Sequence, residues 1–202
     1  NQKCNGQDAV TLQTAFALSC NTAFVEMSEQ LGADELRKYA KAFGVGENYD
    51  LGVSTSAGTL GDLPDGSATA QSVIGQRDVT MTALQAAVMA GTVANKGTRM
   101  QPYLVNRITD AQMKDVRTTK PKKADQAVNE ETAATLTDLM YASERSSWGY
   151  DGNGFASKTG TAEHGEGLAP HVWYVAFDPE RDIAVGVVVK NGGNLGESAT
   201  GG

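Results

Sequence analysis

Apolar residues recur every three or four positions through much of the chain, which is the spacing of amphipathic helices. After Asp34, for example, Leu36, Tyr39 and Phe43 fall on one helical face, and Gly44 ends the pattern. The predicted helices cover residues 10–18, the stretch from Asn21 to Gly32, the stretch from Asp34 to Gly44, the stretch from Thr80 or Thr82 to Asn95, and a last segment that begins at Asn129.

Alternating small, β-branched and apolar residues predict strands at 103–109, 155–163, 171–177 and 183–189. The last stretch is apolar nearly throughout, so we expect it to be buried on both faces. Short connections join the last three strands into an antiparallel meander. Helices followed by such a meander indicate the α+β class, with an antiparallel sheet flanked by helices, rather than alternating βαβ units.

Polar segments separate these elements. Residues 46–66 and 146–154 are rich in Gly, Ser and Asp, and we expect both to be loops. The first is too long for a simple turn, and loops of that length inside a domain are usually functional or mobile. Residues 114–125 are Lys-rich and contain a proline, which predicts a solvated connection.

Composition narrows the classes of protein. The 202 residues fit one domain or the larger part of one, with 40% hydrophobic and 20% charged residues. The formal net charge of -7 argues against nucleic acid or an anionic membrane surface as a partner, because both attract basic patches. No 18-residue apolar run and no signal peptide are visible in the sequence. Both ends look cut, so we expect a piece of a longer protein.

The two cysteines, Cys4 and Cys20, leave two interpretations open. Their spacing and the lack of a nearby histidine do not suit a zinc site. In an exported protein they would form a disulfide, and in a cytosolic protein they would be two small buried thiols.

The stretch 155–163 carries the most suggestive chemistry. Side chains alternate along a strand, so Thr159 and Thr161 would share one face while Lys158 points to the other. Gly160 leaves the backbone bare between the two hydroxyls, where another group can approach closely. Such a strand can grip a small carboxylate and an adjacent carbonyl. The plainer interpretation is a solvated edge strand with an ordinary lysine.

A second short motif lies near the start of the chain. Taken alone, Ser19 or Asn21 is an N-cap for the second predicted helix. Together, Ser19-x-Asn21 and Lys158-Thr159-Gly160 match two of the three motifs of penicillin-recognising serine enzymes. The third motif, Ser-x-x-Lys, supplies the nucleophile, and it does not occur in this sequence.

Several ordered stretches extend this match, and with them the chain resembles the C-terminal part of a penicillin-binding protein transpeptidase domain, of the class B type found in actinobacteria. The stretches are Ala17 to Phe24, Ile74-Gly75-Gln76, Thr82 to Ala87, Ala94 to Gly97 with Pro102, Lys158 to Glu163, and His171 to Val175. Arg77 and Ala83 depart from the family pattern, which commonly has glycine and proline there. The resemblance implies a partial penicillin-binding transpeptidase (serine β-lactamase-like) fold, with residues 1–202 as one part of a single domain.

The family resemblance also implies a function. The parent protein would be a membrane-anchored D,D-transpeptidase on the extracytoplasmic face of the bacterial cell membrane, working in a cell-wall synthesis complex for division or cell shape. Its partners would be peptidoglycan stem peptides ending in D-Ala-D-Ala, and β-lactams would acylate it. The resemblance implies catalytic roles for Ser19, Asn21, Lys158 and Thr161, and substrate binding by Thr159, Gly160 and Thr161. It implies no cofactor and no metal ion.

Two other functions share these motifs: a serine β-lactamase and a non-catalytic β-lactam sensor domain. Asn21 argues against a class D β-lactamase, whose equivalent residue is usually valine. His164 and His171 are not needed by this chemistry, and His171 is expected to begin a strand. Trp148 and Tyr150 either line the cleft or lie on the surface, and the surface is the plainer expectation.

Overall fold

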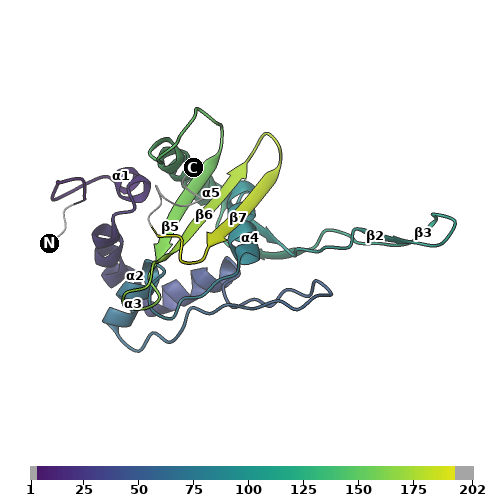
Figure 1. Cartoon of the computed structure of the whole chain (residues 1–202), viewed down its shortest axis with the longest axis horizontal. Helices are drawn as coiled ribbons and strands as arrows, with labels where there is room; N and C mark the ends of the chain where they lie inside the picture. The colour runs from purple at the N-terminus through teal and green to yellow at the C-terminus, as the bar shows by residue number, and fades with distance from the viewer. Residues whose placement is uncertain (1–3, 194–202) are drawn as a thin grey trace.

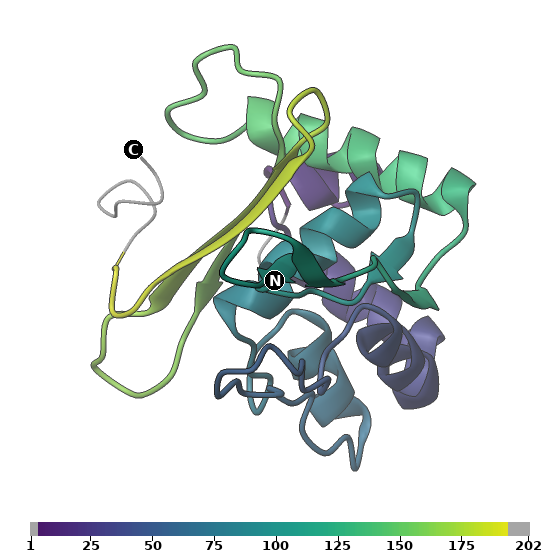
Figure 2. The ribbon, with the colours of Figure 1, turned by 90° about the vertical axis from the view of Figure 1, so that its right-hand side faces the viewer.

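Helices pack on one side of a three-stranded antiparallel sheet in the computed structural model, which describes residues 4–193 (Figures 1 and 2). The helices are α1 (Leu12–Ala17), α2 (Asn21–Ala42), α3 (Gly66–Val73), α4 (Ala83–Ala94) and α5 (Glu130–Arg145). The strands are β1 (Thr98–Met100), β2 (Arg107–Thr109), β3 (Asp115–Thr118), β4 (Lys123–Gln126), β5 (Ala156–Ala162), β6 (His171–Asp178) and β7 (Ile183–Val189). The α+β class predicted from the sequence is confirmed.

The main sheet is the predicted meander, with the strand order β5-β6-β7. Its register pairs Lys158 with Val175 and Thr159 with Tyr174. Since β5 is an outer strand of this sheet, one of its edges remains open to further hydrogen bonds. That edge lies on the side of the molecule that carries α1 and α2 (Figure 1).

The expectation that residues 183–189 are buried on both faces is wrong. Ile183, Val185 and Val187 are exposed, whereas the residues between them are half-buried. The half-buried face packs against α4, and a side chain at Gly186 would clash with the carbonyl oxygen of Ala83. Glycine therefore permits a close approach of helix and strand, and the apolar run belongs to a strand covered on one face.

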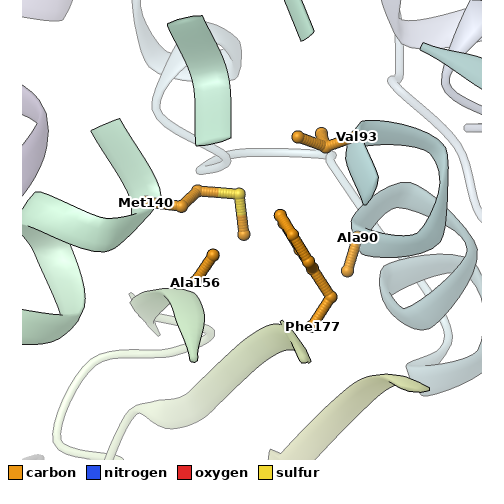
Figure 3. Close-up of a cluster of buried hydrophobic side chains, with 5 residues drawn as sticks. All are labelled: Ala90, Val93, Met140, Ala156 and Phe177. Atoms are coloured by element: carbon orange, nitrogen blue, oxygen red, sulfur yellow. The ribbon is translucent and has the colours of Figure 1, made fainter. Parts of the chain in front are cut away.

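A buried apolar cluster ties β5 to the helices behind it. Figure 3 shows Ala90 and Val93 of α4, Met140 of α5, Ala156 of β5 and Phe177 of β6 converging on one another. Burying a side chain such as Met or Phe stabilises a fold by roughly 1.5–3 kcal/mol. The cluster thus anchors β5 two residues before its lysine.

Helix caps agree with the sequence at two places. Asn129 caps α5, its side chain accepting a hydrogen bond from the Thr132 N–H at 2.8 Å. Of the two caps proposed for the fourth helix, Thr82 is the one used: its hydroxyl accepts from the Gln85 N–H, and the Gln85 side chain accepts from the Thr82 N–H. This reciprocal capping box fixes the start of α4.

The second and third predicted helices are one element, α2, with a kink at Gly32 (φ 74°, ψ 165°). The prediction that Ser19 or Asn21 caps this helix is wrong, because the N-cap is Cys20. The Cys20 side chain is bonded to Cys4 in a disulfide and does not cap the helix end. Of the two interpretations of the cysteines, the disulfide is confirmed.

Three other expectations need correction. The end of the predicted 46–66 loop leads directly into α3, which the sequence pattern missed and which Asp65 caps. The predicted 103–109 strand is reduced to β2, and the 114–125 connection contains β3 and most of β4. Strands β2 and β3 form a hairpin that projects from the body, whereas β4 pairs with β1 (Figure 1). All residues of β3 and β4 are exposed. Because neither strand has a buried face, neither shows the alternation of apolar and polar residues from which a strand is predicted.

Among residues 4–193, every helix is too short or too polar to cross a lipid bilayer.

Candidate active site

The open edge of β5 presents backbone groups of Thr159 and Thr161. The Gln76 side-chain amide donates a hydrogen bond to the Thr161 carbonyl at 3.1 Å, and the Lys158 ammonium donates to the Thr159 carbonyl at 2.8 Å. In an antiparallel strand the N–H and C=O of one residue point to the same side. The N–H groups of Thr159 and Thr161 therefore also face this edge.

Lys158 lies at the centre of the site. Its ammonium donates a hydrogen bond to the Ser19 hydroxyl, 139 positions away in the sequence, and lies 5.8 Å from the centre of the Phe16 ring. Burial lowers the pKa of Lys158 to about 8, because a charged amine loses hydration there. The lysine is thus still mostly protonated at neutral pH, but close to its titration range.

Ser19 occupies a tight turn between α1 and α2. Its backbone has φ 52°, a left-handed conformation that is uncommon for residues other than glycine. Two backbone hydrogen bonds hold the turn, from Ser19 N–H to the Phe16 carbonyl at 3.2 Å and from Cys20 N–H to the Ala15 carbonyl at 2.9 Å. The disulfide from Cys20 to Cys4 ties the same turn to the preceding segment. This geometry keeps the exposed Ser19 side chain against Lys158.

The remaining predicted site residues lie around this contact. Asn21 is the first residue of α2, two positions after Ser19, and its side chain is exposed. Thr159 and Gly160 are half-buried and Thr161 is exposed, so neither threonine is sealed inside the core. The structure therefore brings the two motifs predicted from the sequence to the same place.

A cavity of about 560 Å³ lies beside the strand. Apolar side chains from α2, α4, α5 and the sheet line most of it, including those of Phe43, Met89, Val93, Met140 and Trp173. Lys158 is among its few charged or polar neighbours. An apolar surface next to an ammonium disfavours the charged form, which is the physical reason for the lowered pKa of Lys158.

One residue at the site escaped the sequence analysis. Gln76 follows α3 and bonds to the Thr161 carbonyl, although 85 positions separate them. It belongs to the Ile74-Gly75-Gln76 stretch that carries the family resemblance, but the stretch alone gave no role for it. Gly75, with φ 74°, supplies the turn that precedes it.

The other candidates lie outside the two motifs. The rings of His164 and His171 stack on each other at 3.8 Å near the β5–β6 connection, and His171 begins β6 as expected. Trp148 is 68% exposed and Tyr150 is also exposed, so the surface interpretation of these aromatic residues is confirmed. Within the described residues, no group of three or more His, Cys, Asp or Glu could hold a metal ion.

Comparisons with known proteins agree with this geometry. The sequence matches the family described as "Penicillin binding protein transpeptidase domain" over residues 1–202. It is 44% identical to the peptidoglycan D,D-transpeptidase PbpA of Mycolicibacterium smegmatis, over 98% of this chain and 42% of that protein. It is 40% identical to PbpA of Mycobacterium tuberculosis, again over 98% of this chain and 42% of the relative. The chain thus spans about two fifths of the length of these curated relatives.

Solved structures give the same result. The crystal structure of PBPA from Mycobacterium tuberculosis matches with a TM-score of 0.90 and 41% identity, covering 98% of this chain and 47% of that one. The imipenem acyl-enzyme complex of penicillin-binding protein A from M. tuberculosis matches with a TM-score of 0.91 and 39% identity, covering 98% and 47%. With a family match along its whole length and relatives at this level of identity, the chain belongs to the penicillin-binding protein transpeptidase domain family.

Proposed function

We propose that this chain carries two of the three active-site motifs of a serine-type peptidoglycan D,D-transpeptidase. The observation that carries the proposal is the hydrogen bond between Ser19 and Lys158 beside the open edge of β5. Residues 1–202 are the C-terminal part of a single transpeptidase domain, and the serine and lysine of Ser-x-x-Lys belong to the rest of the longer protein. The length of the relatives, of which this chain covers 42%, leaves room for that segment.

In the first step, the nucleophilic serine oxygen attacks the carbonyl carbon of the penultimate D-Ala of a stem peptide. The bond from that carbon to the terminal D-Ala nitrogen breaks, the nitrogen takes a proton, and an acyl-enzyme remains. The negative charge on the carbonyl oxygen needs N–H donors during this step. The Thr161 N–H, which faces the open edge of β5, is one such donor, and the N–H of the nucleophilic serine is the other.

The terminal carboxylate of the substrate binds on β5. The hydroxyls of Thr159 and Thr161 donate hydrogen bonds to it, and the Lys158 ammonium supplies positive charge nearby. Gly160 has no side chain to obstruct the approach of the substrate to the strand. The carboxylate of a β-lactam occupies the same position, so β-lactams acylate the same serine.

Ser19 delivers the proton to the leaving nitrogen, and Lys158 holds the Ser19 hydroxyl in place. Asn21 bonds to the substrate peptide and to the lysine of Ser-x-x-Lys. In the second step, the amine of another stem peptide attacks the acyl carbon, a new amide bond forms, and the serine oxygen leaves and regains a proton. The product is a cross-link between two peptidoglycan strands.

The setting of the whole protein forms part of the proposal. A disulfide next to the active-site serine turn suits an oxidising compartment, as on the extracytoplasmic face of the cell membrane. We place the parent there, anchored in the membrane and acting with a cell-wall synthesis complex on stem peptides that end in D-Ala-D-Ala.

A fluorescent penicillin tests this function on the full-length parent protein. We expect a covalent adduct on a Ser-x-x-Lys serine that persists for hours, and cross-linked product from two stem peptides. Rapid release of hydrolysed penicillin would instead indicate a β-lactamase, and a stable adduct without cross-linking would indicate a sensor domain. The absence of any adduct would overturn the proposal.

A Ser19→Ala variant tests the site itself. It should slow acylation by roughly 10²-fold, in the range of general acid–base effects, while leaving the melting temperature nearly unchanged. Ser56→Ala, in the 46–66 loop, is a matched control because its hydroxyl bonds only locally, with the Gly58 N–H at 3.4 Å.

A further inference from the structure

Glu144 is a buried carboxylate near the end of α5, with 5% of its surface exposed. Its oxygens accept hydrogen bonds from three side chains: Asn153 at 3.0 Å, Tyr174 at 2.9 Å, and Ser157. Within residues 4–193, the side chains that donate hydrogen bonds to Glu144 are all neutral. A buried carboxylate is costly unless it is well bonded, so a protein that merely needed a filled core would gain more from an apolar residue here.

The three donors come from different elements. Ser157 lies on β5 and is fully buried, Tyr174 lies on β6, and Asn153 belongs to the loop between α5 and β5. The carboxylate thus joins the end of α5 to both strands of the β5–β6 pair. Burial raises the pKa of Tyr174 to about 12, so its hydroxyl remains a donor throughout the ordinary pH range.

The position of this network relative to Thr159 gives it a functional meaning. Ser157 lies two residues before Thr159, on the same face of β5. Tyr174 lies directly opposite Thr159 in the register, and directly paired residues of an antiparallel sheet also share a face. Two neighbours of Thr159 on that face, Ser157 along the strand and Tyr174 across it, are therefore held by a single oxygen of Glu144.

We propose that Glu144 is a positioning residue, which sets the orientation of Thr159 and so the recognition of the substrate carboxylate. This inference rests on the proposed function, in which Thr159 binds that carboxylate. A carboxylate can only accept hydrogen bonds, so it fixes the direction of both hydroxyls that reach it. Side chains that touch a substrate work best when supporting hydrogen bonds lock their surroundings.

Glu144→Gln tests the proposal with little change in shape. The amide has one accepting oxygen in place of two, so at least one of the three donors loses its partner. Tyr174→Phe removes a single donor and leaves the carboxylate in place. Thr92→Val is the matched control, because Thr92 is also buried (1% exposed) but its hydroxyl bonds only within its own helix, α4, to the Val88 carbonyl at 2.7 Å.

The measurement compares acylation of the full-length protein by benzylpenicillin and by its methyl ester, which lacks the carboxylate charge. The wild-type protein should prefer the acid. We expect this preference to fall about tenfold in Glu144→Gln and about threefold in Tyr174→Phe, sizes typical of a lost hydrogen bond. Thr92→Val should keep the wild-type preference, even if its melting temperature falls as much as that of Glu144→Gln. A general loss of stability lowers both rates together and leaves their ratio unchanged.

An activity-independent measurement separates this inference from the proposed function. Amide hydrogen exchange in the peptide covering 156–162 reports the order of β5 whether or not the protein is acylated. We expect faster exchange there in Glu144→Gln than in Thr92→Val. If the wild-type protein is not acylated at all, the proposed function fails, and this exchange comparison alone decides whether Glu144 positions β5.

Two results would overturn the inference. One is an unchanged acid-to-ester preference in Glu144→Gln in a protein that acylates normally. The other is exchange across 156–162 that does not differ between Glu144→Gln and Thr92→Val.

Discussion

At the scale of single residues, Lys158 is the group from which we expect the pH response of the site. Its pKa of about 8, lowered by burial, means that the ammonium is mostly present at pH 7 and mostly lost at pH 9. In the proposed function this charge attracts the substrate carboxylate, so we expect the second-order rate of acylation by benzylpenicillin to fall about tenfold from pH 7 to pH 9. Stopped-flow acylation of the full-length protein across this range measures the effect.

A Lys158→Arg variant serves as the control for that titration. Arginine stays protonated throughout, so its acylation, although weaker, should show no inflection near pH 8. An inflection of the same size in the variant would mean that another group titrates, and Lys158 would not be the origin of the pH dependence.

At the residue scale, short sequence motifs were enough to single out two residues that the structure places side by side. Ser19 and Lys158 were singled out by their neighbours in the sequence, and they are in contact. Gln76 and Glu144 were missed because their partners lie in other elements. The partner of Gln76 is 85 positions away in the sequence, and Tyr174, a partner of Glu144, is 30 positions away. A lone glutamine or glutamate in a helical or loop pattern carries no local sign of such a partner.

Arg77 illustrates a departure from the family pattern that the structure explains. It has φ 64°, the left-handed conformation in which glycine is favoured, which accounts for the glycine commonly found at this position. Its guanidinium donates to the Asp62 carbonyl at 2.5 Å and lies 3.5 Å from the Asp78 carboxylate. These contacts hold the Arg77 side chain against its neighbours.

At the scale of elements, the disulfide is the main covalent constraint on the Ser19 turn. It joins positions 16 apart, and closing a loop of about that length stabilises a fold by roughly 3 kcal/mol. We expect Cys4→Ser to lose about this much. Cys20→Ser should lose about 1 kcal/mol less, because residue 20 is the N-cap of α2 and serine is a good cap where cysteine is not.

Urea unfolding of the two single variants, measured in the same buffer, checks this ordering. Equal losses would show that the new serine does not cap α2. A larger loss for Cys20→Ser than for Cys4→Ser would contradict the assignment of the N-cap.

For the β2–β3 hairpin, in contrast to the disulfide, we expect little contribution to stability. It projects from the body and pairs with itself, and an isolated two-stranded hairpin contributes little stability in water (Figure 1). Replacing residues 107–118 by Asn-Gly would join Asn106 to Thr119, whose N–H already bonds to the Asn106 carbonyl at 2.7 Å. We expect the melting temperature to change by less than about 2 °C, by calorimetry. A fall of more than about 5 °C would show that the hairpin supports the body.

At the scale of the whole molecule, the sequence predicted the order of elements better than their surroundings. The meander and most of the helices follow from local periodicity and caps, as at Asn129 and Thr82. The wrong predictions share one cause: they depend on how an element packs against the rest of the fold, which the local pattern of apolar and polar residues does not encode. Residues 183–189 look buried on both faces, yet only the face toward α4 is covered, and β3 and β4 pair through their backbones with side chains exposed.

A last prediction concerns the reaction of the isolated 202 residues with penicillin. The sequence has no Ser-x-x-Lys, and an apolar cavity of about 560 Å³ lies beside Lys158. We expect the full-length protein to form an adduct with fluorescent penicillin and the isolated chain to form none. The reason is that no serine of this chain, Ser19 included, belongs to a Ser-x-x-Lys motif. Intact-mass spectrometry after incubation makes the comparison. An adduct located on Ser19 would instead make this serine the nucleophile and Lys158 its base, and the proposed division of roles between the motifs would be wrong.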